Sequence, residues 1–254
     1  MHVSAMLLPL FPVLWGAVSV SADTGMVGQA VALCREIEAR FRAFRTMCWT
    51  ADRVTDTGRG QVREKWVFRF AAPDRLRVDY FEPYERHIII RGARMWEYLP
   101  DARKALCTEF SSPGEKERRV ARTLEPVTIP GIRPGDPEEI AARAVAAEAT
   151  PEGWIRLECR RPRSVIVLDA RHRLVRGMEV YRGKVLVLRS EVLDIQQPAP
   201  GFFFPHRMRV VTRGNGQAVI SRVELRGVSV DTDMPSGIFE FIPPPGTEVI
   251  HAAP

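Results

Sequence analysis

Short runs in which apolar and polar side chains alternate recur along most of the chain, and this period-two pattern restricts its fold more than any other feature. The pattern is clearest at residues 66–70 and 76–80, where large apolar side chains alternate mainly with Arg and Asp. Such alternation is typical of strands that bury one face. Turn-forming residues at 56–58 and 72–74 separate the runs. The runs therefore predict hairpins of an antiparallel sheet.

The same pattern continues to the end of the chain. It predicts further strands around residues 47–49, 87–91, 95–99, 104–110, 154–160, 165–169, 174–181, 185–193, 202–212 and 218–230. The last two flank Asn215 and Gly216, a strong hairpin signal because both residues tolerate a positive φ. Residues 238–242 are expected to form a closing edge strand, because the three prolines that follow cannot donate to a ladder.

Two segments break the alternation. Residues 26–44 carry apolar side chains at steps of three and four, which predicts an amphipathic helix. Residues 111–149 are rich in charge and proline, and we expect a charged loop followed by a short helix. That helix should begin at residues 136–139, where Pro137 suits the first turn and Glu138 and Glu139 suit its positive end.

These elements predict a mainly β protein with helices, of the α+β class. We expect a curved antiparallel sheet that forms an incomplete β-barrel of about eleven strands, covered by the N-terminal helix and the middle helix. The alternating apolar side chains are more numerous than two helices can cover. The surplus indicates an apolar hollow inside the sheet, where a ligand commonly binds.

Residues 1–22 have the pattern of a secretory signal peptide, because an apolar stretch leads to the small residues Ser21 and Ala22. A helix packed on the domain is the alternative, since only His2 stands where Lys or Arg is usual. The mature domain would then span residues 23–254 and lie in the periplasm. The net charge of +6 is spread along the chain without a basic block, so no nucleic-acid partner is expected.

The four cysteines are Cys34, Cys48, Cys107 and Cys159. In an oxidising compartment they allow up to two disulfides with three connectivities, or they remain buried free thiols. None has the close spacing of a metal or redox site, so we expect no metal and no cofactor. The chain also lacks the motifs of a nucleophile elbow, a zinc protease or a phosphate loop, so no catalytic residue is assigned.

Two stretches resemble a known family. Residues 66–80 are followed by a turn at Pro83, an aliphatic strand at 88–90, Gly92 and the run from Met95 to Pro100, and the chain closes on an alternating Phe run with prolines at 239–249. This order resembles the LolA-like outer-membrane lipoprotein carriers, the lipoprotein-sorting family. The resemblance implies an incomplete barrel with a helical lid that receives the acyl chains of lipoproteins, or of a related lipid, in the periplasm and moves them toward the outer membrane.

The resemblance also implies partners beyond the acyl chains, namely an inner-membrane transporter and an outer-membrane receptor, and we expect a monomer. Related sensors of the same fold bind a lipoprotein, a lipid or a protein partner without transporting it, and this alternative stays open. Several carriers have a basic residue before the strand-joining proline that helps to hold the lid. This chain has Ala72 there, and Arg69 or Arg75 could take its place.

The candidate acyl groove consists of large side chains expected on one pleat face, with ordinary core packing as the alternative. They are Trp49, Trp66, Phe68, Phe70, Leu76, Val78, Tyr80, Ile88, Ile90, Trp96 and Tyr98. The candidate underside of the lid is the apolar stripe of the N-terminal helix, with helix-on-sheet packing as the alternative. Its residues are Val27, Val31, Ile37, Phe41 and Phe44.

Overall fold

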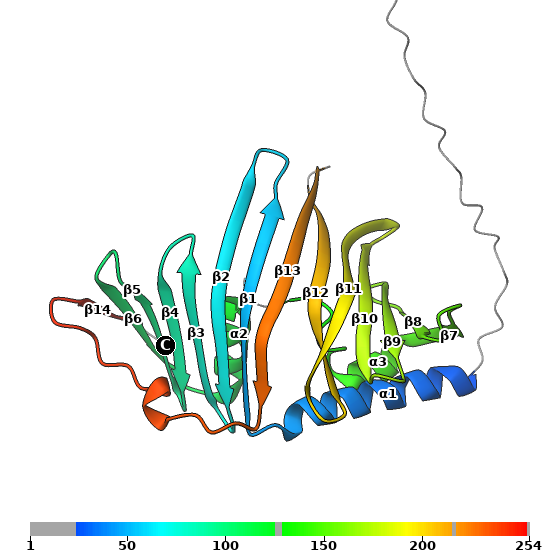
Figure 1. Cartoon of the computed structure of the whole chain (residues 1–254), viewed down its shortest axis with the longest axis horizontal. Helices are drawn as coiled ribbons and strands as arrows, with labels where there is room; N and C mark the ends of the chain where they lie inside the picture. Colours follow the sequence, from blue (N-terminus) through cyan, green and yellow to red (C-terminus); the bar gives the residue numbers. More distant parts are fainter. Residues whose placement is uncertain (1–23, 125–128, 215–216, 253–254) are drawn as a thin grey trace, which may run out of the picture.

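The computed structural model describes residues 24–124, 129–214 and 217–252, so the expected signal peptide lies outside it. The described residues form a long series of strands together with three α-helices and one 3-10 turn (Figure 1). The first strands are β1 (Thr46–Asp56), β2 (Gln61–Ala71), β3 (Arg75–Glu82), β4 (Arg86–Arg91), β5 (Arg94–Leu99) and β6 (Lys104–Glu109). The later ones are β7 (Ala144–Ala149), β8 (Ile155–Cys159), β9 (Ser164–Asp169), β10 (Leu174–Arg182), β11 (Val185–Ala199), β12 (Phe202–Gly214), β13 (Gln217–Val230) and β14 (Glu248–Ala252).

All of these strands belong to one open, curved sheet of 14 strands in the order β14-β6-β5-β4-β3-β2-β1-β13-β12-β11-β10-β9-β8-β7. Neighbours run antiparallel, except that β14 pairs parallel with β6. The helices are α1 (Thr24–Ala43), α2 (Pro113–Leu124), α3 (Pro137–Arg143) and the short 3-10 turn η2 (Ser236–Phe239). The predicted class, a mainly β protein with an incompletely closed sheet and helices, is confirmed. The expected number of about eleven strands was too low.

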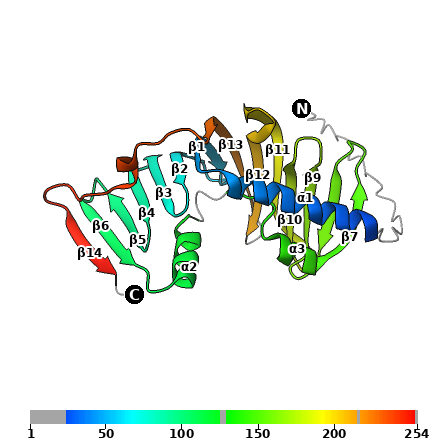
Figure 2. The same ribbon diagram turned by 90° about the horizontal axis from the view of Figure 1, so that it is seen from below.

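The sheet has two faces that differ in what covers them. Figure 2 shows it as an arch with α1, α2 and α3 on the inside, and with the segment that follows β13 running across the outside. We call these the inner face and the outer face. The inner face holds two apolar clusters, one on β1–β4 and β11–β13 and one between α1, α3 and β7–β10. Among the residues that the structure describes, no helix is long and apolar enough to span a membrane.

The segment at residues 111–149 contains more structure than the sequence predicted. The short helix is confirmed as α3, and the Asp136 side chain accepts a hydrogen bond from Glu138 N at 2.8 Å. However, α2 occupies the expected charged loop. Its start has a capping signal that the sequence analysis missed, because Ser112 Oγ accepts a hydrogen bond from Glu115 N at 3.3 Å. Strand β7 was missed because its Ala-rich sequence has a weak strand signal.

The expected edge strand at residues 238–242 was wrong. Residues 238 and 239 belong to η2 and residues 240–242 form no strand, because the segment binds the outer face instead: Arg77 Nη1 donates to Ile238 O at 2.9 Å, and the Phe239 ring is almost fully buried. The strand that closes the chain, β14, comes after the prolines and pairs with β6. The prolines therefore end one extended segment but not the sheet.

All four cysteines have free thiols in the structure. Cys34 and Cys159 lie in the same buried cluster beneath α1. Burial raises the pKa of the Cys34 thiol to about 12, with a smaller contribution from Cys159. Cys48 on β1 and Cys107 on β6 are separated by four strands of the sheet. The choice of disulfide pairing stays a prediction.

Residues 231–247, between β13 and β14, run across the outer face, and we call them the crossing segment. A buried carboxylate, that of Asp79, organises the outer face beneath this segment. The Asp79 side chain is 7% exposed and accepts hydrogen bonds from Arg77 Nε at 2.8 Å and from Arg69 Nη1. His87 Nδ1 lies 2.6 Å from Asp79 Oδ1. Burial alone would raise the pKa of this carboxyl, but the hydrogen bonds from His87 and Arg77 outweigh it and hold the pKa below its ordinary value. Asp79 thus stabilises the fold as a carboxylate.

Replacing Asp79 with Asn should lower the free energy of unfolding at pH 7 by about 2–3 kcal/mol, because Arg69 and Arg77 lose their shared counter-charge. A lowered carboxyl pKa stabilises the fold above the unfolded pKa of about 3.9 and ceases to do so as pH falls through the folded value. The difference between D79N and the parent protein should therefore shrink below about pH 4. Urea unfolding at a series of pH values measures it.

The matched control is Glu240→Gln. Glu240 lies on the crossing segment, and the substitution removes its exposed ion pair with Arg91 of β4. This change should alter stability by less than about 0.5 kcal/mol at either pH. An Asp79→Asn effect equally small at pH 7 would contradict the role assigned to the buried carboxylate.

Candidate functional site

The inner face of β1–β4 carries an apolar floor whose rows are set by strand register. In one row Trp49 pairs with Phe68, Phe68 with Val78, and Val78 with Ile88. The neighbouring row runs from Met47 through Phe70 and Leu76 to Ile90. Side chains two residues apart on a strand share a face, so both rows point the same way. We call this surface the inner groove.

The groove floor is packed but not wholly covered. The Trp49 and Phe68 rings are stacked with centroids 3.9 Å apart, and Trp66 and Tyr80 lie 6.2 Å apart. Trp66, Val78 and Ile88 are completely buried, whereas Phe68, Phe70 and Leu76 keep part of their surface exposed. The part-exposed side chains form the portion of the floor that a ligand could contact.

Covering elements close over the floor from two directions. From α2 and the chain after it, Val120 and Ile132 pack against the cluster, and Ile129 is buried in it. From the other side, Phe44 lies 4.7 Å from Phe202, measured between ring centroids, just beyond the end of α1. This apolar surface therefore lies between α2 and the C-terminal end of α1, and both elements cover part of it.

A third row marks the polar end of the groove. Trp66 pairs with Tyr80, and Tyr80 pairs with Arg86. The Arg86 guanidinium lies 5.6 Å from the centre of the Tyr80 ring, and its Nη2 is 3.0 Å from Glu97 Oε1. This end of the groove combines aromatic rings with charged groups that are already paired.

Arg53 and Glu64 pair two residues further along β1 and β2, toward the hairpin that joins these strands. Arg53 donates two hydrogen bonds of 2.6 Å to the Glu64 carboxylate. The Arg53 guanidinium also lies 5.1 Å from the centre of the Trp66 ring, an arrangement that favours a cation–π contact. The two paired arginines thus border the groove toward the β1–β2 hairpin.

The structure brings nine of the eleven predicted groove residues together and separates two. The nine on the inner face are Trp49, Trp66, Phe68, Phe70, Leu76, Val78, Tyr80, Ile88 and Ile90. Trp96 pairs with Ile89, and Tyr98 pairs with His87, and both pairs lie on the outer face. The prediction that all eleven share one pleat face was wrong for Trp96 and Tyr98. Whether the nine bind a ligand stays a prediction.

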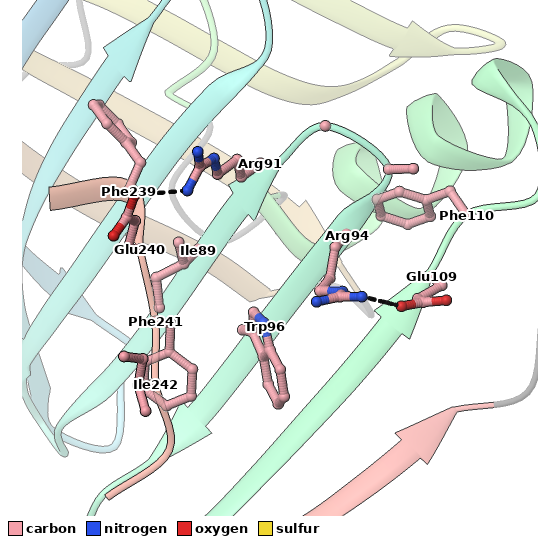
Figure 3. Close-up of a pocket in the computed structure, with 12 residues that line it drawn as sticks. Ile89, Arg91, Arg94, Trp96, Glu109, Phe110, Phe239, Glu240, Phe241 and Ile242 are labelled. Carbon is pink, nitrogen blue, oxygen red and sulfur yellow. Dashed lines mark hydrogen bonds and ion pairs between the residues drawn. The ribbon is translucent and has the colours of Figure 1, made fainter. Parts of the chain in front are cut away.

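Trp96 instead lines a pocket between β4–β6 and the crossing segment (Figure 3). The pocket has a volume of ≈ 780 Å³, within the range of small-molecule sites. The rings of Trp96 and Phe241 lie 5.3 Å apart, and Ile242 beside them is 85% exposed. The pairs Arg91–Glu240 and Arg94–Glu109 lie at its edge (Figure 3). The outer pocket is a second candidate site.

The predicted lid residues divide between the two inner clusters. Val31 and Ile37 are buried between α1 and β7–β9, and Val27 packs against them. Phe41 contacts both clusters, and Phe44 belongs with the groove. Most of α1 therefore covers the far half of the sheet, and only its C-terminal end reaches the groove.

Basic residues do hold α1, but not those expected to replace Ala72. Arg69 and Arg75 face the crossing segment on the outer face, where Arg75 lies 5.5 Å from the centre of the Phe239 ring. On the inner face, Arg40 of α1 donates to Gly201 O in the β11–β12 turn. Arg133 Nε donates a hydrogen bond of 3.0 Å to Oε2 of the buried Glu38 of α1.

Phe202 and Phe204 belong to the groove cluster, yet sequence reasoning placed them only on a strand. Phe204 lies 5.7 Å from Trp49, measured between ring centroids. The run of three phenylalanines at residues 202–204 was the available signal. Sequence reasoning also missed Arg53 and Arg86, because charged residues in strands normally face solvent.

No family model and no curated protein sequence matches this chain. Several solved structures are similar in fold, among them the following three. A DUF1329 family protein from Desulfovibrio piger superposes with a TM-score of 0.55 at 14% identity, covering 84% of this chain and 97% of that one. An outer-membrane lipoprotein-sorting protein domain from Vibrio parahaemolyticus gives 0.55 at 12% identity, covering 84% and 97%. A LolA superfamily protein from Nitrosomonas europaea gives 0.50 at 11% identity, covering 87% and 99%.

These similarities span nearly the full length of the other chains. At such low sequence identity they show a shared fold and nothing more. The open curved sheet and the helices on its inner face are the features that the resemblance in the sequence had implied. The chain therefore shares its fold with these three structures, as the resemblance in the sequence had implied.

Proposed function

We propose that this protein is a periplasmic carrier that binds the acyl chains of lipoproteins, or of a related lipid, in its inner groove and moves them toward the outer membrane. The observation that carries the proposal is the set of part-exposed apolar side chains on the inner face, Phe68, Phe70 and Leu76, beneath covering helices. Single part-exposed apolar side chains are common on protein surfaces, but these three are neighbours in adjacent rows of one sheet face and form a contiguous apolar patch, which suits a ligand.

The physical chemistry of acyl binding suits this surface. Removing acyl chains from water contributes about 0.8 kcal/mol per buried methylene, so part of one chain supplies useful affinity. The binding requires no reactive group. Two of the similar structures are a lipoprotein-sorting protein domain and a LolA superfamily protein, which supports this function by analogy of fold.

A sensor or regulatory module of the same fold is the second candidate. The outer pocket favours it, because the exposed Ile242 and the rings of Trp96 and Phe241 present an apolar surface away from the groove. Such a surface suits a protein partner. A sensor would bind a lipoprotein, a lipid or a protein partner without passing it on.

The proposal predicts that groove substitutions weaken acyl binding. Leu76→Gln and Phe68→Gln should each reduce the affinity for a fluorescent fatty-acyl probe roughly tenfold, because a buried amide is placed against the chain without a partner. Fluorescence titration of the purified protein measures the affinity, and circular dichroism checks the fold.

Tyr98→Gln is the matched control, since Tyr98 lies on the outer face of the same half of the sheet. Its affinity for the probe should match that of the parent protein. Equal affinity in the groove variants, or a parent protein that takes up no probe, would refute the inner groove as an acyl site.

Transfer separates the carrier from the sensor. Probe-loaded protein is mixed with vesicles of phosphatidylethanolamine and phosphatidylglycerol, and the probe remaining on the protein is followed over time. A carrier should release the probe within minutes, at a rate that rises with vesicle concentration. Retention of the probe at all vesicle concentrations would favour the sensor.

A further inference from the structure

One wall of the outer pocket is a stretch of extended backbone without a ladder partner. Residues 240–242 line the pocket and form no strand, and the backbone of Glu240 is extended, with φ −99° and ψ 141°. Among the described residues, no protein group forms a hydrogen bond with the backbone N–H or C=O of Phe241 or Ile242. Such groups pair readily with a second extended segment that lies beside them. The crossing segment therefore offers a short free edge beside the pocket.

An apolar strip runs along this edge. Phe239 is 1% exposed and anchors the crossing segment on the sheet. The rings of Trp96 and Phe241 lie 5.3 Å apart and are both half-buried, and Ile242 follows them at 85% exposure (Figure 3). Single exposed apolar side chains are ordinary, but here three of them adjoin an unpaired backbone edge. This combination is typical of sites that bind an extended peptide.

The ion pairs at the pocket edge restrict the charge of its ligand. Arg91 Nη1 lies 2.8 Å from Glu240 Oε1, and Arg94 Nε donates to Glu109 Oε1 at 3.0 Å. Each guanidinium thus has its own carboxylate, and the two pairs carry no net charge. An anionic lipid or a nucleic acid would meet the glutamates as well as the arginines and gain little. The pocket therefore suits a ligand that is uncharged where it lies over the floor.

The backbone wall favours a peptide over other apolar ligands. A hydrocarbon chain along residues 240–242 would displace water from their N–H and C=O groups without replacing its hydrogen bonds, which is unfavourable. An extended peptide would instead pair with the same groups. Its alternate side chains would then point toward the floor, as Phe239 and Phe241 do.

We propose that the outer pocket binds an extended, uncharged segment of a partner protein. The segment pairs with the backbone of residues 240–242 and lays alternate apolar side chains over Trp96 and Phe241. The site lies on the face of the sheet opposite the inner groove, so the inference goes beyond acyl binding and does not depend on it.

The first test selects random dodecapeptides displayed on phage against the purified protein. We expect enriched sequences in which apolar residues alternate with uncharged polar ones, because only alternate side chains reach the floor. The affinity of the tightest synthetic peptide should change less than about twofold between about 0.05 M and about 0.5 M salt, since no net charge is engaged.

The second test examines the ladder itself. Two versions of the selected peptide carry N-methyl groups on complementary sets of alternate amides. The version that blocks the amides facing the crossing segment should bind at least about tenfold more weakly, and the other version should bind like the unmodified peptide. Only amides directed at the free edge lose hydrogen bonds on methylation.

Ile242→Asp places a charge on the apolar strip and should weaken the selected peptide about tenfold or more. Because Ile242 is exposed, the fold and the affinity for the fluorescent acyl probe should match those of the parent protein. Leu193→Asp is the matched control. Leu193 is 54% exposed on β11, toward the other end of the sheet, and its replacement should change neither affinity.

Several outcomes would overturn the inference. They are a selection without enrichment, enriched peptides with apolar residues at helical steps of three and four, equal binding by both methylated peptides, and full affinity in Ile242→Asp. A dimer detected by light scattering that Ile242→Asp dissociates would also overturn it, because a second copy of the chain would then occupy the pocket. Failure of the acyl probe to bind would remove the proposed carrier function and leave the peptide site intact.

Discussion

The unbroken ladder from β14 to β7 is the constraint on which the rest of the structure depends. Because each strand fixes the register of the next, alternating residues of β1–β4 reach opposite faces in matched rows. A slip of one residue in β2 would exchange Phe68 with Arg69. The groove would then gain an arginine, and Asp79 on the outer face would lose one of its partners. The inner groove and the buried outer carboxylate are thus two results of the same register.

Much of this arrangement could be predicted from the sequence, because alternation within a strand decides its faces. The runs at 66–70 and 76–80 gave the correct inner face of β2 and β3. Trp96 and Tyr98 were assigned to the wrong face. Which residues of two hairpin strands share a face depends on the number of residues in the turn between them. The two-residue turn at Gly92 and Ala93 pairs residue 91 with 94 and therefore Ile89 with Trp96. That count was available in the sequence, but the aromatic character of Trp96 was given more weight.

Other features could not be predicted because they depend on contacts distant in sequence. Strand β14 pairs with β6 in parallel, and no local pattern announces a partner more than a hundred residues away. The segment at residues 238–242 alternates like a strand, yet Phe239 and the carbonyl of Ile238 find better partners on the outer face. The buried polar atoms of Trp66 and Tyr80, which have no partner among the described residues, were equally hidden, since Trp and Tyr were counted as apolar side chains. Their polar atoms matter only once burial is known.

The order of rows along the strands gives the groove a direction. At the end nearest α1 lie Phe44 and Phe202, then the apolar floor, then the buried polar atoms of Trp66 and Tyr80, and last the paired Arg53 and Glu64. In the proposed function, the apolar rows would supply affinity without directional preference, because the hydrophobic effect depends on the apolar area removed from water. The paired arginines at the other end make that end of the surface polar, so the two ends differ in the ligand groups that they can accept.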